Sequence, residues 1–157
     1  MPNISLLAPV PLEHLIDACT LCRAKGKVAF GSRAWQVFRE LDIAREGETV
    51  ETYIYASGDK SFESFEVSWY GRYIGHVEGN NGAHPDGMLF RPASTTKDPR
   101  DNKGHWAVFW ELDQLRQLQP HERISTGEFH GFESGKKYKK HFTPQGPIIV
   151  LAHHLPH

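Results

Sequence analysis

The sequence predicts an α+β fold: a small, strongly curved, mostly antiparallel β-sheet or barrel, flanked by an N-terminal helix and short helices. Three observations predict it. Apolar residues recur at helical spacing near the N-terminus, strict alternation begins at Thr49, and the turns between later strands are too short for helical crossovers. The length of 157 residues is typical of one domain, so we expect a single domain over residues 1–157.

Three segments carry helical patterns. Residues 11–25 place Leu15, Cys19 and Cys22 on one apolar face, and Gly26 follows where a helix commonly ends. "GSRAWQVFREL" predicts a short helix with Ser32 as its N-cap. "LDQLRQLQP" predicts a third, brief helix that Pro120 ends.

The strands are expected where the period changes to two. The segments are "KVAF", "TVETYIYAS", "FEVSWYG", "RYIGHVEG", "GMLFRP", "HWAVFWEL" and "GPIIVLAHH". A turn is expected at residues 57–61, and Gly71 predicts a bend or bulge between two strands. Residues 91–104 form the one long polar connection, which we expect to be mobile.

Composition excludes several classes of protein. The net charge of −1 gives no global basic field, so nucleic-acid binding would need a local patch. No signal-peptide pattern and no apolar run of about 20 residues is present, which predicts a cytoplasmic protein with no membrane partner. The sequence does not predict the oligomeric state.

Neither the cysteines nor the histidines predict a metal or cofactor site. Cys19 and Cys22 lie within the predicted helix, on its apolar face, which favours packed core thiols over a redox or zinc pair. The ten histidines form no HExxH pattern, and the C-terminal "AHHLPH" lies at a chain end that is expected to fray. We therefore expect no metal and no cofactor.

The segment "NGAHPDG" allows two interpretations. Its glycines and Pro85 are turn formers, so a purely architectural loop is sufficient. It could instead form the rim of a pocket that includes His84, with Arg91 just beyond it binding a phosphate or carboxylate.

The segment "SGKKYKKHF" is the one cluster of basic residues. It contains Lys136, Lys137, Lys139 and Lys140 with aromatic residues between them. Lysines can neutralise phosphates while a ring stacks on a base. Lysines also keep an exposed strand or hairpin from aggregating, and both interpretations stay open.

The order of features from "GSRAWQVFREL" through "GETVETYIYASG" to "VSWYGRYIGHVEG" resembles the PUA-like superfamily, which includes the EVE, YTH and ASCH domains. The resemblance covers roughly residues 28–79. It implies a small curved β-barrel with flanking helices that binds a modified or extruded base in an aromatic pocket. Carried over to this chain, it implies that Ser32 and Trp35 border the pocket and that Tyr55 lines its wall. Glu48 stands where the family often has aspartate, and the family's short lysine-rich segment is not evident.

Three functions follow. The first is a binding module for nucleic acid or a modified base or nucleotide, with Ser32, Trp35, Tyr55, His84 and Arg91 at the ligand and the four lysines on a DNA or RNA backbone. The second is a small enzyme that transfers protons through a His–Asp pair, His84 with Asp86 or His105 with Asp113. The third is a protein-interaction domain. The resemblance favours a binding module over a catalyst.

Overall fold

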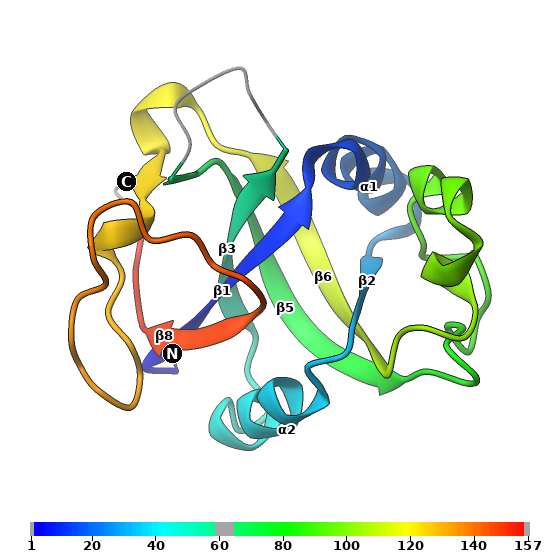
Figure 1. Cartoon of the computed structure of the whole chain (residues 1–157), viewed down its shortest axis with the longest axis horizontal. Coiled ribbons are helices and arrows are strands. Elements are labelled where there is room, and N and C mark those ends of the chain that lie inside the picture. Colours follow the sequence, from blue (N-terminus) through cyan, green and yellow to red (C-terminus); the bar gives the residue numbers. More distant parts are fainter. Residues whose placement is uncertain (1, 59–64, 156–157) are drawn as a thin grey trace.

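The described residues form a six-stranded mixed sheet with two α-helices packed against it (Figure 1). The structure is a computed structural model and describes residues 2–58 and 65–155. The strands are β1 (Ile4–Pro11), β2 (Val28–Ser32), β3 (Val50–Ser57), β4 (Glu66–Val67), β5 (Trp69–Glu78), β6 (Val108–Gln117), β7 (Ile124–Ser125) and β8 (Ile148–Leu151). The helices are α1 (Leu12–Lys25) and α2 (Trp35–Ala44), with 3₁₀ helices η1 (Ala93–Lys97), η2 (Pro99–Asn102), η3 (Pro120–Glu122) and η4 (Thr126–Glu128).

The strand order is β2-β6-β5-β3-β1-β8, with β4 and β7 paired separately. β1 and β3 pair in parallel, and the other described ladders are antiparallel, which confirms the predicted α+β class and the mostly antiparallel sheet. No ladder among the described residues joins the edge strands β2 and β8. The sheet is therefore open, and the alternative of a closed barrel is wrong.

Helix α1 covers one face of the sheet and confirms the predicted N-terminal helix. Leu15 and Ala18 are fully buried, and Gly26 ends the helix in the left-handed region with φ +88°, as an αL cap does. Cys19 and Cys22 are free and buried. The Cys19 thiol lies 3.6 Å from the Leu115 carbonyl oxygen, so the prediction of packed core thiols is confirmed.

The structure differs from the prediction at four places. β1 was not expected at all. "GMLFRP" forms turns instead of a strand, and "LDQLRQLQP" continues β6 to Gln117 before η3 begins. The expected strand "FEVSWYG" is divided between β4 and the start of β5, and "RYIGHVEG" continues β5, with a register shift at Gly71 that confirms the predicted bulge. The turn expected at residues 57–61 falls partly outside the described residues.

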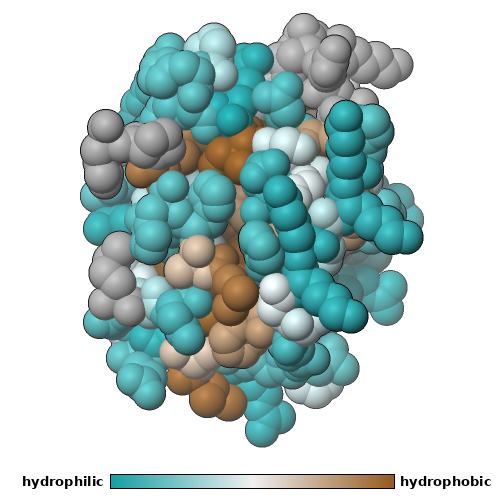
Figure 2. All heavy atoms as spheres, turned by 90° about the vertical axis from the view of Figure 1, so that its left-hand side faces the viewer, coloured by the Kyte–Doolittle hydropathy of each residue, from teal (hydrophilic) through white to brown (hydrophobic). Residues whose placement is uncertain are grey.

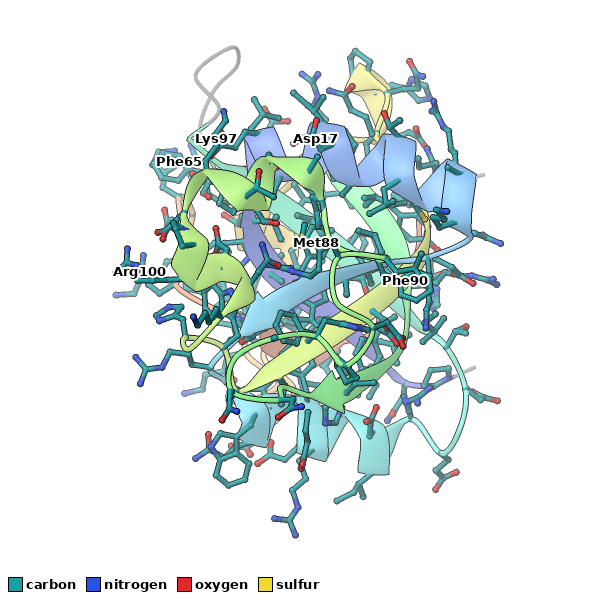
Figure 3. All side chains as sticks on the ribbon, turned by 90° about the vertical axis from the view of Figure 1, so that its right-hand side faces the viewer. Asp17, Phe65, Met88, Phe90, Lys97 and Arg100 are labelled. Carbon is teal, nitrogen blue, oxygen red and sulfur yellow. The ribbon has the colours of Figure 1, made fainter. Side chains whose placement is uncertain are left out.

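The long polar connection after Arg91 folds into η1 and η2, which pack beside α1 (Figures 1 and 3). Figure 3 shows this face, with Lys97 and Arg100 projecting from the two 3₁₀ helices. No helix in the described part of the chain combines the length and the apolar character that crossing a membrane requires.

Candidate ligand pocket

A pocket of about 380 Å³ opens where the C-terminal end of β1 comes opposite the edge strand β2. Its walls come from segments far apart in the sequence: residues 9–11, His14 in the first turn of α1, residues 30–34, the η1–η2 region and residues 145–147. The ladder with β8 covers only Ile4–Leu7 of β1, so the end of β1 at residues 9–11 has no described strand beside it on that edge, and the pocket lies between this end and β2.

Aromatic rings form one wall of this pocket. Phe30 and Trp110 face each other across the β2–β6 ladder with ring centroids 5.1 Å apart, and Trp110 is nearly buried. Trp106 lies against Gly31 so closely that a Cβ added to Gly31 would stand 2.3–2.5 Å from three atoms of the indole five-membered ring. Gly31 is therefore the residue that lets the Trp106 ring pack against the strand.

The polar edge of the pocket is formed by His14 and Asp101, which we call the pocket pair. The His14 Nε2 atom lies 3.8 Å from Asp101 Oδ2, and His14 Nδ1 lies 2.7 Å from the Ser94 hydroxyl oxygen. The Trp106 indole N–H donates to Asp101 Oδ1 at 3.3 Å. Both side chains keep partial exposure, 15% for His14 and 20% for Asp101, so the pocket combines an aromatic wall with a polar edge that a ligand can reach.

Arg91 lines the pocket and also holds it together. Its guanidinium group donates to the Asn102 side chain at 2.9 Å and to the carbonyl oxygens of Ala29 and Asp101 at 2.9 and 2.8 Å. Burial lowers the pKa of Arg91 to about 10, an effect that the nearby Asp101 charge opposes. Because these acceptors lie in η2 and in β2, Arg91 connects the two elements and fixes the position of Asp101.

Ser32 lines the pocket as well, at the end of β2. Its hydroxyl accepts a hydrogen bond from the Ala34 N–H at 3.0 Å. Helix α2 begins later, at Trp35, with Ala34 in the N-cap position, so the prediction of Ser32 as the N-cap is wrong. Arg33, between these residues, lines the pocket and is exposed, and no carboxylate of the described residues forms an ion pair with it. Sequence reasoning missed Arg33.

The other predicted ligand residues lie elsewhere in the described structure. Trp35 is 45% exposed on the first turn of α2, beside the pocket but not among its lining residues. Tyr55 lies on the same side of β3 as Tyr53, which packs with Leu7, Val67 and Phe129 in the smaller of the two described clusters of buried hydrophobic residues. Whether either residue contacts a ligand stays a prediction.

The four lysines of the basic cluster are exposed on the connection before β8. Figure 1 places that connection at the left edge of the view, whereas η1 and η2 stand at the right. Figure 2 shows the left-hand face, on which hydrophilic side chains surround a strip of apolar surface. Lys137 pairs with Glu128 at 3.4 Å, and the Tyr138 and Phe142 rings stack at 4.3 Å. None of the four lysines lines the pocket, although residues 131–134 and Tyr138 of the same connection meet Val37 and Glu40 of helix α2.

His84 is buried and pairs with Glu111, and we call these two residues the buried pair. The His84 Nε2 atom lies 3.1 Å from Glu111 Oε2, and the Asp86 backbone N–H donates to His84 Nδ1 at 3.0 Å. Lys27 completes the group at 3.2 Å from Glu111 Oε1. Both nitrogens of the ring are occupied and only 1% of the side chain is exposed, so His84 anchors the "NGAHPDG" turn to β6.

The two His–Asp pairs considered for proton transfer do not converge. The Asp86 backbone, not its carboxylate, contacts His84. Asp113 forms a bidentate ion pair with Arg72, while His105 packs on Trp106. Within the described residues no three His, Cys, Asp or Glu side chains are placed to hold a metal ion, and His157 lies outside that part of the chain.

Comparisons with protein-family models, with curated proteins and with solved structures find no match to this chain. The functional interpretation therefore rests on the pocket itself.

Proposed function

We propose that the protein is a binding module that holds a planar base or nucleotide, free or within nucleic acid, in the pocket between β1 and β2. The observation that carries the proposal is the combination of the Phe30, Trp106 and Trp110 rings with the pocket pair in a space of about 380 Å³. Pockets of roughly 300–1,000 Å³ with apolar walls and few polar groups are typical of small-molecule sites. We also propose that the curved, open sheet is a PUA-like fold.

Arg33 supports a ligand that carries a phosphate. Its exposed guanidinium group stands at the pocket next to Ser32, without a competing carboxylate among the described residues. Arginine binds phosphate oxygens in a bidentate manner. A nucleotide with its base against Trp106 therefore has a cation available for its phosphate.

The lysine cluster supports a longer ligand. None of Lys136, Lys137, Lys139 and Lys140 lines the pocket, so we expect a mononucleotide bound there not to depend on them. They are available to neighbouring phosphates of a strand that runs across the surface. Substituting glutamine for all four should leave mononucleotide affinity unchanged and flatten the salt dependence of oligonucleotide binding.

The test is a calorimetric titration of the whole chain with nucleoside monophosphates and with short single-stranded oligonucleotides at low salt. Stacking on an aromatic ring contributes about 1–3 kcal/mol per base, so Trp106→Ala should weaken binding about tenfold or more. Trp35→Ala, which removes an exposed indole next to the pocket, tests in the same titration whether the predicted contact of Trp35 with the ligand exists. Binding that is absent with every nucleotide and oligonucleotide, or that is insensitive to Trp106→Ala, contradicts the proposal.

A second candidate function is proton transfer on the bound ligand. The observation that favours it is the pocket pair, a histidine and a carboxylate with Nε2 and Oδ2 3.8 Å apart at the edge of the pocket. Mass spectrometry of nucleotides incubated with the protein separates the two functions. An enzyme that uses this pair to activate water for hydrolysis of the nucleotide releases products of changed mass and loses that activity in His14→Gln, whereas a binding module returns each nucleotide unchanged.

A further inference from the structure

We infer that the pocket selects guanine among the bases, because Asp101 and His14 present one hydrogen-bond donor beside two acceptors. This inference rests on the proposed function and specifies its ligand. It concerns the hydrogen bonds to the edge of the base, whereas the aromatic wall explains only how the face of the base stacks. The residues that carry it are the pocket pair, Ser94 and Trp106.

The Asp101 carboxylate has acceptor capacity to spare. An ionised carboxylate has about four lone-pair sites. The Trp106 indole N–H takes one of them at 3.3 Å. His14 Nε2 stands 3.8 Å away, beyond hydrogen-bond distance, so it takes none. Arg91 and the Asp101 backbone fix the residue, since the guanidinium donates to the Asp101 carbonyl oxygen at 2.8 Å. The remaining lone pairs of both oxygens are available to a ligand.

His14 supplies the donor. Its Nδ1 lies 2.7 Å from the buried Ser94 hydroxyl, and we assign this hydroxyl as the donor to Nδ1, which places the ring N–H on Nε2. Nε2 is the atom that stands beside Asp101. A ligand edge therefore meets an N–H first and two carboxylate oxygens next to it.

Guanine complements this arrangement and the other bases do not. Its Watson–Crick edge carries the O6 acceptor followed by two adjacent donors, N1–H and the 2-amino group. Adenine and cytosine turn a ring-nitrogen lone pair toward the carboxylate beside a single amino group. Uracil and thymine present one N–H between two carbonyl oxygens. A site built to hydrogen-bond two donors rejects ligands that lack one of them, because its partly desolvated acceptor is then unpaired.

The experiment compares guanosine, inosine, adenosine, cytidine and uridine 5′-monophosphates in calorimetric titrations of the whole chain. Inosine keeps O6 and N1–H but lacks the 2-amino group. We expect GMP to bind about tenfold or more tightly than the other four nucleotides, since one good bidentate contact discriminates by about that factor. Single-stranded oligothymidylates with one central guanine, inosine or adenine form the second arm. The tighter of GMP and the guanine oligonucleotide identifies the source of the base.

Asp101→Asn is the decisive variant, and its circular dichroism spectrum and unfolding midpoint verify the fold. The amide retains an acceptor for the Trp106 N–H but places a donor where the carboxylate offered its second acceptor. The preference for GMP over IMP should fall below about threefold while stacking continues to hold both nucleotides. Equal binding of all five nucleotides by the unaltered protein, or a guanine preference that survives Asp101→Asn, overturns the guanine assignment but leaves the base-binding function intact. Absence of any nucleotide binding overturns both.

Discussion

The buried pair and the pocket pair contain the same two kinds of side chain in opposite environments. His84 and Glu111 are 1% and 8% exposed, and Lys27 and the Asp86 backbone take part in the same network. His14 and Asp101 are 15% and 20% exposed, and the Asp101 carboxylate accepts one hydrogen bond from the described residues. The buried pair therefore has little hydrogen-bonding capacity left for a ligand, while the pocket pair has much.

The difference shows why a histidine close to an acidic residue in sequence is a poor guide to chemistry. His84 and Asp86 stand two positions apart in a turn, yet the turn uses the histidine for its own closure. His14 and Asp101 are far apart in the chain and meet only because η2 packs beside α1. Partial exposure and unused acceptor capacity distinguish the two pairs better than spacing does.

The largest effect should come from breaking the buried pair. Glu111→Leu leaves His84 Nε2 and the Lys27 ammonium without their acceptor, which should lower the free energy of unfolding by about 3–5 kcal/mol. Asp101→Leu, the same type of change in the pocket pair, should cost about 1 kcal/mol or less, because water replaces its partner. Urea denaturation of both variants measures the difference. Equal losses would mean that the pocket pair is structural too.

The next effect concerns the aromatic wall. Gly31→Ala places a methyl group where the Trp106 ring lies, so the ring must move, which should cost about 1–3 kcal/mol of stability and weaken nucleotide binding. Gly146→Ala adds a methyl group at another wall of the same pocket, with no atom within 4 Å, and should change stability by less than about 0.5 kcal/mol. Thermal unfolding of the two variants, followed by nucleotide titration, tests the contrast. Gly31→Ala with unaltered stability would show that Trp106 has room to shift.

A third histidine, His153, lies in an environment that makes the stability of the fold depend on pH. Burial, followed by repulsion from His154, lowers the pKa of His153, whose ring packs on Tyr53 and Phe129. Since the unfolded histidine titrates near 6.5, the unfolded chain binds the proton more readily below that pH. The His153 contribution is therefore present above about pH 6.5 and is lost on acidification.

We expect the urea midpoint of His153→Asn to fall less between pH 7 and pH 5 than that of the unaltered protein. His121→Asn, which removes an exposed histidine, serves as the control. A loss on acidification that is as large in His153→Asn as in the unaltered protein would assign the pH dependence to other groups.

The smallest effect is expected at Trp35. Because its side chain is 45% exposed, Trp35→Ala should change the free energy of unfolding by less than about 1 kcal/mol. Trp110→Ala, which truncates a nearly buried ring of the pocket wall, should cost about 3–5 kcal/mol. Chemical denaturation separates the two. A cost above about 2 kcal/mol for Trp35→Ala would mean that this residue packs more tightly in solution than its exposure indicates.

Elements with simple periodicity could be predicted from the sequence, and elements with a bulge could not. Leu112, Leu115 and Leu118 are spaced by three, which favours a helix. In β6, Asp113 and Arg116 pair with Arg72 and Tyr70, so one extra residue opposes Gly71, and Gln114 takes a positive φ of 51°. This bulge places Leu112 and Leu115 in one core cluster, and the return to alternation places Leu118 in the other.

β1 was not predicted because it contains two prolines. Pro9 and Pro11 argue against a central strand, since proline has no N–H to donate. The ladder between β1 and β8 covers only Ile4 to Leu7, so both prolines lie beyond it and pair with β3 alone. The pocket could not be predicted from the sequence either, because its residues come from five segments that only the folded chain brings together.

The position of β1 within the sheet has a consequence for biosynthesis. This strand leaves the ribosome well before its antiparallel partner β8, because the ladder pairs Ile4 with Leu151. Until β8 arrives, one edge of a strand with fully buried Leu6 and Leu7 stays unpaired, which is the kind of edge that recruits other chains. Folding of the sheet is then completed only after synthesis of β8, and chains that stop before Ile148 should aggregate.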